Sequence, residues 1–460
     1  MQVSGITPEI QVLVSQRQHD ELREILNTWQ PGELAELIEE FEDESDQFCI
    51  FNALPQTLAA QTFEYLDLSF QKSLLKTLSY GRLAGILNEM APDDRTALLE
   101  ELPPITVTHL LSLLTPKERS VALSLLHYPE YSIGRIMTPE FIAVREGWTV
   151  KQALDYIRRY GQNSETLNVI YVVDDKGFLL DDIRVREFLL AQPDMKVSDL
   201  MDNSFTSLLV TDDQETAVAA FAKLSRVALP VIDTEGIMVG IVTIDDAMEV
   251  AQEEDTEDIQ KLGAVEALEN PYLDVSIFEM VKKRGVWLVI LFLGEMLTAS
   301  AMGYFEDEIA KAVVLALFIP LIISSGGNTG SQAATLVIRA MALGEVTLSD
   351  WWRVMRREII SGIMLGTILG IIGFSRIALW STFSDIYGEH WFPLALTVGF
   401  SLLGVVLWGT LSGSMFPLIL KRFGLDPATS SAPFVATLVD VTGLIIYFTL
   451  AMFLLRGTML

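Results

Sequence analysis

The stretch Ala312-Val-Val-Leu-Ala-Leu-Phe-Ile-Pro-Leu-Ile-Ile-Ser-Ser-Gly-Gly-Asn-Thr-Gly-Ser-Gln-Ala-Ala-Thr-Leu-Val-Ile338 runs for 27 residues without a charged side chain. At 1.5 Å per residue, a helix of this length crosses a hydrocarbon core of about 30 Å. Four further segments are similarly apolar: residues 285–304, residues 359–375 with an extension past Arg376 to about 382, residues 391–420 and residues 427–455. The sequence therefore predicts a five-helix α-helical transmembrane domain over residues 281–460.

The charge of the chain is divided unevenly. Residues 1–280 carry a net charge of −30 and residues 281–460 a net charge of +1, which together make the −29 of the whole chain. A soluble region this acidic repels polyanions and attracts cations, so nucleic acid is excluded as an expected partner. Acidity that serves only solubility is the alternative. The single cysteine and the four scattered histidines exclude a disulfide framework and a Cys/His zinc site of the usual spacing.

Nine basic residues flank the apolar segments on one side, whereas the opposite loops hold acidic residues with Lys311 as their cation. The nine precede the first span, follow the second and lie between the fourth and fifth: Lys282, Lys283, Arg284, Arg339, Arg353, Arg356, Arg357, Lys421 and Arg422. The positive-inside rule then predicts a multi-pass protein of the cell membrane with a cytoplasmic N-terminal region and an external C-terminus. The first 30 residues lack the apolar core of a signal peptide, in agreement with this orientation.

Two polar features interrupt the apolar spans. Asp440 stands in the middle of the last span, where a carboxylate is costly unless it faces water or a partner, so it is a candidate functional residue. A structural hydrogen bond to a neighbouring helix is the alternative. Residues 320–332 bring a proline, three glycines and six polar side chains, Asn328 among them, into the second span. We expect them to break the apolar stretch and to offer oxygens to the water shell of a hard cation. Close helix packing is the alternative.

Small residues recur at helical spacing in the third and fourth spans. Gly362, Gly366 and Gly370 follow each other at intervals of four, as do Gly409 and Gly413. This pattern predicts close helix packing.

The soluble half has two kinds of pattern. Up to about residue 130, short amphipathic segments separated by Pro or Asp predict a compact all-α domain. Beyond Gly134, two units about 60 residues apart each combine a helix with buried strands, as in Val169–Val173 and in Leu229–Asp233 followed by Ile237–Thr243. They are an internal repeat of α/β units. The acidic segment 249–266 follows and is predicted to be a helix.

The second of these units resembles the later half of a CBS domain. The resemblance lies in Leu229-Pro-Val-Ile-Asp and in Gly240-Ile-Val-Thr-Ile-Asp-Asp246. The first unit departs from the pattern at Leu180-Asp-Asp-Ile183, where a glycine is usual, and this weakens the expectation of nucleotide binding there. ATP at the CBS domain stays an open alternative.

The whole order of segments resembles the MgtE family of magnesium transporters. The most specific motifs are Gly326-Gly-Asn-Thr-Gly-Ser-Gln332, Thr256-Glu-Asp-Ile-Gln-Lys-Leu-Gly-Ala-Val265 and Ala436-Thr-Leu-Val-Asp-Val-Thr-Gly443. The resemblance implies a homodimer that conducts Mg²⁺ through a channel-like pore and senses cytoplasmic Mg²⁺. It implies the segments 1–130 (N-domain), 131–200 and 201–252 (CBS units), 253–280 (connecting plug helix) and 281–460 (pore domain).

The same resemblance implies roles for individual acidic residues. Asp440 corresponds to the carboxylate of the pore and Asp426 to one near the pore mouth. The remaining expected metal ligands lie in the N-domain and along the second CBS unit and plug helix: Asp93, Asp246, Glu249, Glu254 and Glu257. Gln61, Ser225 and Ala432 depart from the family pattern, which weakens some of the sensor and pore assignments.

Other functional classes fit less well. No histidine lies inside a predicted span and no Gly-Lys-Ser/Thr motif is present, so we expect neither an enzyme nor an ATP-driven pump. An anion channel would not place Asp440 at mid-membrane, and a simple membrane anchor would not need a polar second span. The choice among Mg²⁺, Mn²⁺ and Co²⁺, and between channel and coupled carrier, stays open.

Overall fold

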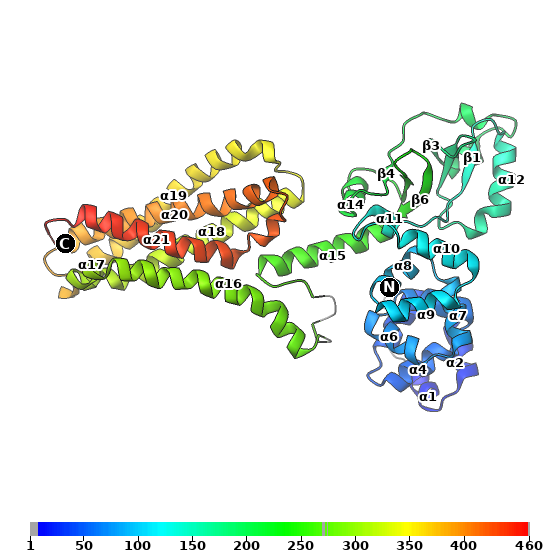
Figure 1. Ribbon diagram of the computed structural model, residues 1–460, viewed down its shortest axis with the longest axis horizontal. Helices are drawn as coiled ribbons and strands as arrows, with labels where there is room; N and C mark the ends of the chain where they lie inside the picture. Colours follow the sequence, from blue (N-terminus) through cyan, green and yellow to red (C-terminus); the bar gives the residue numbers. More distant parts are fainter. Residues whose placement is uncertain (1–7, 269–271, 274, 459–460) are drawn as a thin grey trace. The chain divides into compact units, whose positions relative to one another are not determined.

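The computed structural model describes residues 8–268, 272–273 and 275–458, and Figure 1 shows its elements in chain order. The chain divides into two compact units, Met1–Glu254 and Asp255–Leu460. The division falls inside one helix, α15 (Ile244–Leu262), whose last two turns belong to the second unit.

The first part of unit 1 is a stack of short helices around one apolar core. The helices are α1 (Pro8–Ser15), α2 (His19–Leu26), α3 (Pro31–Glu39), α4 (Glu44–Ala53), α5 (Gln56–Glu64), α6 (Leu68–Thr77), α7 (Tyr80–Glu89), α8 (Pro92–Glu100), α9 (Pro104–Leu113) and α10 (Pro116–Leu125). Proline stands in the first turn of α3, α8, α9 and α10, where its missing N–H costs nothing. Thr115 caps α10 by accepting a hydrogen bond from Glu118 N. The predicted all-α domain is confirmed.

The second part of unit 1 holds two copies of one small sheet. Strand β1 (Ala143–Arg145) runs parallel to β2 (Val169–Val173), which pairs antiparallel with β3 (Leu179–Arg184). Strands β4 (Leu208–Leu209), β5 (Ala228–Ile232) and β6 (Met238–Thr243) repeat that order and direction. The tight turns between β2 and β3 and between β5 and β6 are closed by Gly177 (φ +93°) and Gly236 (φ +88°). The predicted α/β repeat is confirmed.

Short helices accompany these sheets. They are α11 (Ile133–Ile136), α12 (Val150–Tyr160), η1 (Gly161–Asn163), α13 (Val185–Leu190), η2 (Val197–Asp199) and α14 (Glu215–Phe221). A shared apolar core joins the sheets, because Tyr171 and Leu179 of the first copy pack with Ala228 and Ile241 of the second.

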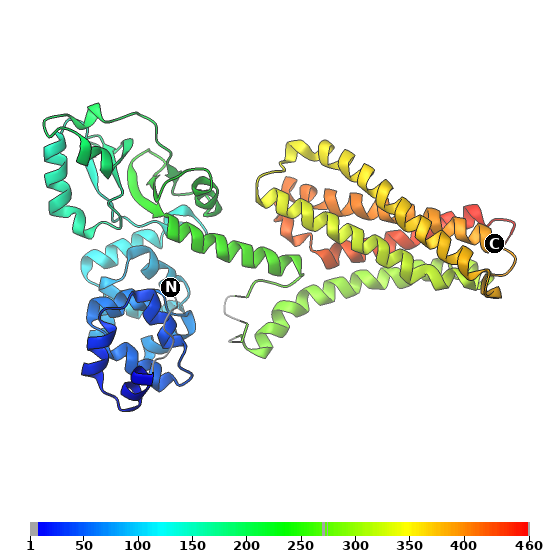
Figure 2. The same cartoon turned by 180° about the vertical axis from the view of Figure 1, so that it is seen from behind.

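Unit 2 contains five helices long and apolar enough to cross a membrane. Its elements are α16 (Ile277–Tyr304), α17 (Glu306–Lys311), η3 (Val313–Phe318), α18 (Ile319–Ala342), η4 (Leu348–Asp350), α19 (Trp351–Trp380), η5 (Asp385–Tyr387), α20 (Trp391–Arg422), η6 (Pro427–Thr429) and α21 (Ala432–Leu454). In both Figure 1 and Figure 2, α16 runs beside α21, whereas α19 lies along α20. The five predicted spans are confirmed.

The polar stretch of the second span lies inside one continuous helix. The polar residues 320–332 do not break the helix, because α18 is continuous from Ile319 to Ala342. Pro320 stands in the first turn of α18, where it starts the helix and leaves its ladder of hydrogen bonds intact. Ser325 and Thr329 satisfy their hydroxyls within the helix by donating to Leu321 O (2.7 Å) and Ser325 O (2.9 Å).

The glycines pack the spans closely, as predicted. A Cβ on Gly413 of α20 would lie 2.0 Å from Gly330 O, and one on Gly409 would lie 2.4 Å from Gly326 O. A Cβ on Gly366 of α19 would lie 2.9 Å from Leu403 Cα of α20. The glycine motifs of α18 and α19 therefore bring both helices against the backbone of α20.

Candidate functional site

The Asp440 carboxylate lies halfway along α21 and faces α18. A Cβ built on Gly327 would lie 3.5 Å from Asp440 Oδ1 and 3.4 Å from Ala436 Cβ, so α18 and α21 approach each other at this level. Asp440 is half-buried, and across the described residues no hydrogen bond or ion pair engages its carboxylate. A partner-free carboxylate inside a membrane domain is a candidate ion ligand.

Asn328 is one residue beyond Gly327 and lies on an exposed side of α18. Its Nδ2 atom lies 3.4 Å from Ser324 Oγ, one turn earlier on the helix. Meanwhile Gly326 and Gly330 are buried against α20 and α21. The small residues of segment 320–332 therefore pack against neighbouring helices, whereas Ser324 and Asn328 leave polar atoms outside the helix contacts.

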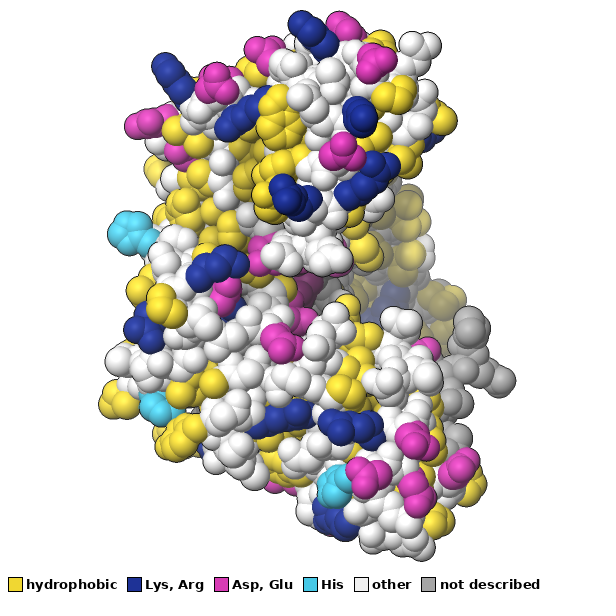
Figure 3. All heavy atoms as spheres, turned by 90° about the vertical axis from the view of Figure 1, so that its right-hand side faces the viewer, with side chains coloured by type: hydrophobic (Ala, Val, Ile, Leu, Met, Phe, Trp, Pro, Cys, Tyr) yellow, Lys and Arg dark blue, Asp and Glu magenta, His cyan; other side chains and the backbone are white. Residues whose placement is uncertain are grey.

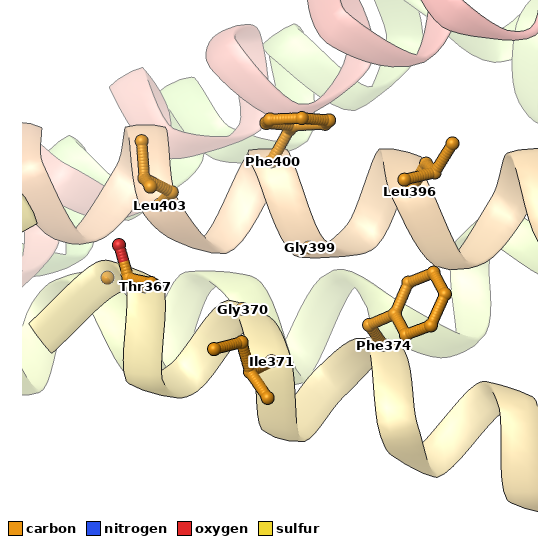
Figure 4. A pocket seen from close by; sticks show the side chains of 9 residues that line it. Thr367, Gly370, Ile371, Phe374, Leu396, Gly399, Phe400 and Leu403 are labelled. Carbon is orange, nitrogen blue, oxygen red and sulfur yellow. The ribbon is translucent and has the colours of Figure 1, made fainter.

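Two cavities of unit 2 lie apart from Asp440. One, of about 230 Å³, is an apolar groove between α19 and α20, lined by Gly366, Thr367, Gly370, Ile371, Phe374, Leu396, Gly399, Phe400 and Leu403. Figure 4 shows Phe374 and Ile371 on one helix and Leu396, Phe400 and Leu403 on the other, with the Thr367 hydroxyl as the only side-chain oxygen drawn. The second, of about 450 Å³, brings Arg376 near Ser324 and Ser325. The apolar wall makes the first cavity a poor surface for a dication, and the second cavity adds the charge of Arg376 beside Ser324.

A second group of acidic residues gathers in unit 1, where the helical domain meets the CBS units. We call it the carboxyl cluster, and its members are Glu64 of α5, Asp93 and Asp94 of α8, Glu165 of the loop after η1, and Asp246 of α15. Figure 3 views unit 1 from the right-hand side of Figure 1 and shows acidic side chains in the hollow across the middle of that face.

Asp93 is the most buried member of the carboxyl cluster. It is 8% exposed, and its Oδ1 atom has no hydrogen-bond partner among the described residues. Burial raises the pKa of Asp93 well above its ordinary value, and the charges of Asp246, Asp94 and Glu165 raise it further. An unpaired buried carboxylate oxygen surrounded by like charge favours the binding of a proton or a metal cation.

The other members of the carboxyl cluster are perturbed in the same direction. Burial, followed by the charges of Glu64 and Asp246, raises the pKa of Asp94 to about 8. Burial also raises the pKa of Glu64 to about 7, although its carboxylate accepts a hydrogen bond from Ala91 N at 2.8 Å. For Asp246, burial raises the pKa to about 6, while a hydrogen bond from the Thr243 hydroxyl opposes the shift.

The predicted ligands on α15 have different surroundings. Glu249 is exposed, and its charge is one of those that raise the pKa of Asp94. The Glu254 carboxylate accepts a hydrogen bond from Gln214 Nε2 at 2.9 Å. Glu257 and Asp426 both contact the ammonium of Lys261, with Oε1 of Glu257 at 2.6 Å and Oδ2 of Asp426 at 2.7 Å from Nζ.

Lys261 keeps its charge in this position. Burial lowers its pKa, but the hydrogen bonds to Asp426 and Glu257 outweigh burial and raise the pKa overall. The two predicted ligands are therefore neutralised here by a cation of the chain itself. Throughout the described ranges, no group of three His, Cys, Asp or Glu side chains is arranged to hold a metal ion. Sites of one or two carboxylates are what a hydrated Mg²⁺ requires.

Sequence reasoning missed Glu64, Asp94, Glu165 and Lys261. Glu64 and Glu165 carry no local motif, and only the packing of the helical domain on the CBS units brings them to Asp93. Lys261 stands in the motif 256–265, one helical turn after Glu257, and this i,i+4 spacing is the signal that could have identified the pair.

The contact between the CBS copies contains a second polar group. Asp182 on β3 accepts a hydrogen bond from Arg226 Nη2 at 3.0 Å, and burial raises its pKa to about 6. Its other oxygen and the hydroxyl of Tyr171 are buried without a partner in the described structure. The unusual acidic residue of the first copy is thus partly neutralised by the second copy.

Comparisons with known proteins agree with this architecture. Residues 11–131 match the MgtE intracellular N domain, residues 133–194 and 197–253 match CBS domains, and residues 319–450 match the divalent cation transporter family MgtE. The magnesium transporter MgtE of Thermus thermophilus is 40% identical over 72% of this chain and 71% of its own length. That of Bacillus subtilis is 30% identical over 88% of this chain and 90% of its own.

Two solved structures are similar to unit 1 of this chain. The soluble part of a magnesium transporter is 28% identical over 53% of this chain and 96% of its own length, with a TM-score of 0.50. The cytosolic domain of the Mg²⁺ channel MgtE in complex with ATP is 35% identical over 50% of this chain and 93% of its own, with a TM-score of 0.48.

A helical domain, a CBS tandem and five apolar helices with an intramembrane carboxylate define a CBS-containing membrane transport protein. The chain belongs to the MgtE family of magnesium transporters. The resemblance and the predicted fold class, an all-α N-domain, an α/β CBS tandem, a connecting helix and a five-helix transmembrane domain, are confirmed.

Proposed function

We propose that this magnesium transporter is a homodimeric, channel-like pore in which Asp440 holds a hydrated Mg²⁺, gated by Mg²⁺ bound to the cytoplasmic unit. The observation that carries the pore assignment is the Asp440 carboxylate, which lies in the middle of α21 against Gly327 and has no partner among the described residues. Mg²⁺ dehydrates reluctantly and binds through one or two carboxylates, with waters completing its shell. One Asp per subunit suits that chemistry.

The proposal of a dimer follows from the placement of the polar residues. Ser324 and Asn328 are exposed on the single subunit, so a pore that they line needs a second copy opposite. In α16, Thr298 is the one residue of the described helix that is buried. Much of that helix is therefore free to face lipid or the second copy.

The proposal of gating rests on the carboxyl cluster. Without divalent ions, Asp93, Asp94 and Asp246 repel one another across the contact between the helical domain and the CBS units. Bound Mg²⁺ would neutralise this charge and stabilise the contact, and the closed contact would act on the pore through α15. A switch from mostly open to mostly closed requires about 5 kcal/mol of differential binding, which several weak sites together supply.

Flux measurements with purified protein in liposomes test the pore. Wild-type protein should conduct Mg²⁺, and Asp440→Ala should abolish the flux while the protein still assembles as a dimer. The matched control is Glu358→Gln in α19, which removes another half-buried carboxylate of a span and should leave the flux intact. Full Mg²⁺ flux through Asp440→Ala would exclude Asp440 from the pore. Parallel measurements with Mn²⁺ and Co²⁺ address ion preference.

Membrane orientation and nucleotide binding belong to the same proposal. The basic flanks of the spans support a cytoplasmic unit 1 and an external C-terminus, which protease access to sealed vesicles would test.

For ATP at the CBS tandem, the Arg226–Asp182 ion pair between the two copies offers a place where a nucleotide would compete with an internal contact. Calorimetric titration of ATP onto wild-type protein and Asp182→Asn tests it.

A further inference from the structure

The last turn of α15 is attached to the rest of unit 2 by contacts that need no metal. Leu262 packs against the apolar core of unit 2, which includes Ala428, Val435 and Val439. Just after the helix, Ala264 adopts a left-handed conformation (φ +57°) and turns the chain. Glu266 N then donates to Lys283 O at 3.3 Å, at the start of the first span.

Lys261 makes the polar part of this attachment. Its ammonium contacts Asp426 Oδ2 at 2.7 Å, across 165 residues of sequence, and Glu257 Oε1 at 2.6 Å, one turn back on α15. The side chains of Lys261 and Asp426 are 28% and 37% exposed, so the pair is better shielded from solvent than a surface ion pair. The Asp255–Arg339 pair, which joins α15 to the end of α18, is 60% and 55% exposed and is correspondingly weaker.

Asp426 links this attachment to the span that carries Asp440. Its second oxygen, Oδ1, accepts a hydrogen bond from Ala428 N at 2.8 Å and thereby caps η6. Three residues after Ala428, Ser431 caps α21 by accepting from Phe434 N at 3.4 Å. The loop that holds the Lys261 ammonium thus leads through two caps into the start of α21.

We propose that Lys261 is a positioning residue that tethers the connecting helix to the loop before α21, so that movement of α15 reaches the Asp440 helix without a metal ion at this point. The proposal rests on the proposed function, since it specifies how the cytoplasmic unit acts on the pore. It also assigns Glu257 and Asp426 a different role: they hold an ammonium and so are not a Mg²⁺ site in this arrangement.

The test compares gating in variants of the full-length protein. Inside-out membrane vesicles expose the cytoplasmic unit to the bath, and release of preloaded, isotopically labelled Mg²⁺ is measured at micromolar and at millimolar bath Mg²⁺. The gating ratio is the first rate divided by the second. For Lys261→Met we expect this ratio to fall by about three- to fivefold, the factor that one partly shielded ion pair supplies.

Further variants separate the tether from other effects. Lys261→Arg keeps a cation within reach and should retain the wild-type ratio, as should Lys421→Met, which removes an exposed cation from the same side of the bundle. Asp426→Asn breaks the ion pair but keeps an oxygen that can cap Ala428, so it should lower the ratio as Lys261→Met does. The double variant Lys261→Met/Asp426→Asn should be no worse than either single variant.

The outcomes are distinguishable from failure of the proposed function. Absence of Mg²⁺ release from wild-type vesicles would overturn the pore, and release that ignores bath Mg²⁺ would overturn both gating and the tether. With a gated wild type, an unchanged or increased ratio in Lys261→Met would overturn the tether alone. An increased ratio would point instead to a metal site uncovered at Glu257 and Asp426. Additive losses of the gating ratio in the double variant would also overturn the tether.

Discussion

At the scale of single residues, the carboxyl cluster stores electrostatic repulsion in the folded protein. Asp94, with a pKa of about 8, and Glu64, with a pKa of about 7, are raised above their ordinary values chiefly by burial. A carboxyl whose pKa is raised on folding binds its proton more tightly in the folded state. It therefore destabilises the fold progressively as pH rises through the folded pKa, and the effect is absent below the unfolded pKa.

The loss of stability with rising pH leads to a prediction that can be measured. In EDTA, the thermal midpoint of the full-length protein in detergent should fall as pH is raised from about 6 to about 8.5, the window that the pKa values of Asp94 and Glu64 define. Millimolar Mg²⁺ should flatten this dependence, because it replaces the protons. Asp94→Asn should also flatten it, by removing the group with the higher pKa. A midpoint that rises over the same window in EDTA would contradict the prediction.

A second prediction at this scale concerns Asp93. Its Oδ1 atom is buried without a partner in the described structure, and burial opposes its ionisation, so Asp93→Asn replaces a carboxyl that is costly to ionise by a neutral amide of the same shape. We expect the variant to be more stable in EDTA than wild type, by about 1–3 kcal/mol, and to gain less from added Mg²⁺. Thermal unfolding with and without Mg²⁺ measures both. A variant less stable than wild type in EDTA would show that the charge is compensated.

At the scale of elements, the transmembrane unit is assembled by backbone contact between helices. The carbonyl oxygens of Gly326 and Gly330 on α18 lie where a side chain on Gly409 or Gly413 of α20 would have to be. This packing holds α18 so that Gly327 meets Asp440 of α21. The glycines thus position the candidate ion site without contributing a ligand.

Gly413→Ala should therefore damage the fold and, with it, the flux. The added methyl would stand 2.0 Å from Gly330 O, a backbone atom that can move only if α18 moves. We expect a loss of about 1–3 kcal/mol in stability and a strong loss of Mg²⁺ flux in liposomes. Gly404→Ala on the same helix is the matched control, because its nearest neighbour is a side-chain methyl of Ile446 at 3.3 Å. Equal behaviour of the two variants would refute the packing argument.

At the scale of the whole molecule, the negative charge is separated from the apolar bundle. The net charge of −30 lies on residues 1–280, and the near-neutral remainder carries the spans. Neutralisation of the acidic unit by a dication is the event that the proposed gating requires. The connecting helix α15 is the covalent link through which it acts.

Mg²⁺ should accordingly protect the cytoplasmic unit from limited proteolysis of the full-length protein. If millimolar Mg²⁺ stabilises the contact at the carboxyl cluster, as the proposed gating requires, it should slow cleavage of unit 1 several-fold. The effect should be much smaller in Asp93→Ala/Asp246→Ala, which removes the core of the cluster. Equal cleavage rates with and without Mg²⁺ in wild type would argue against the sensor.

Much of the architecture followed from local patterns. The five spans, the repeat of the CBS copies and the glycine faces are properties of short segments, where hydrophobic length and spacing act alone. The local pattern of residues 320–332 did not decide whether this polar stretch stays helical. In the structure, Pro320 occupies the first turn, and Gly326 and Gly330 are compensated by contact with α20.

Five segments long and apolar enough to cross a membrane, the negative charge that precedes them and the lone carboxylate Asp440 in the last segment can all be recognised in the sequence alone. The gathering of Glu64, Asp94 and Glu165 around Asp93 became visible only in the tertiary structure. The same holds for the ion pair between Lys261 and Asp426. These features differ in the sequence separation of the residues on which they depend. The length of an apolar span and the spacing of residues along a helix depend on some 20 consecutive residues. The pairing of charges that are distant in sequence depends on which helices and strands pack together.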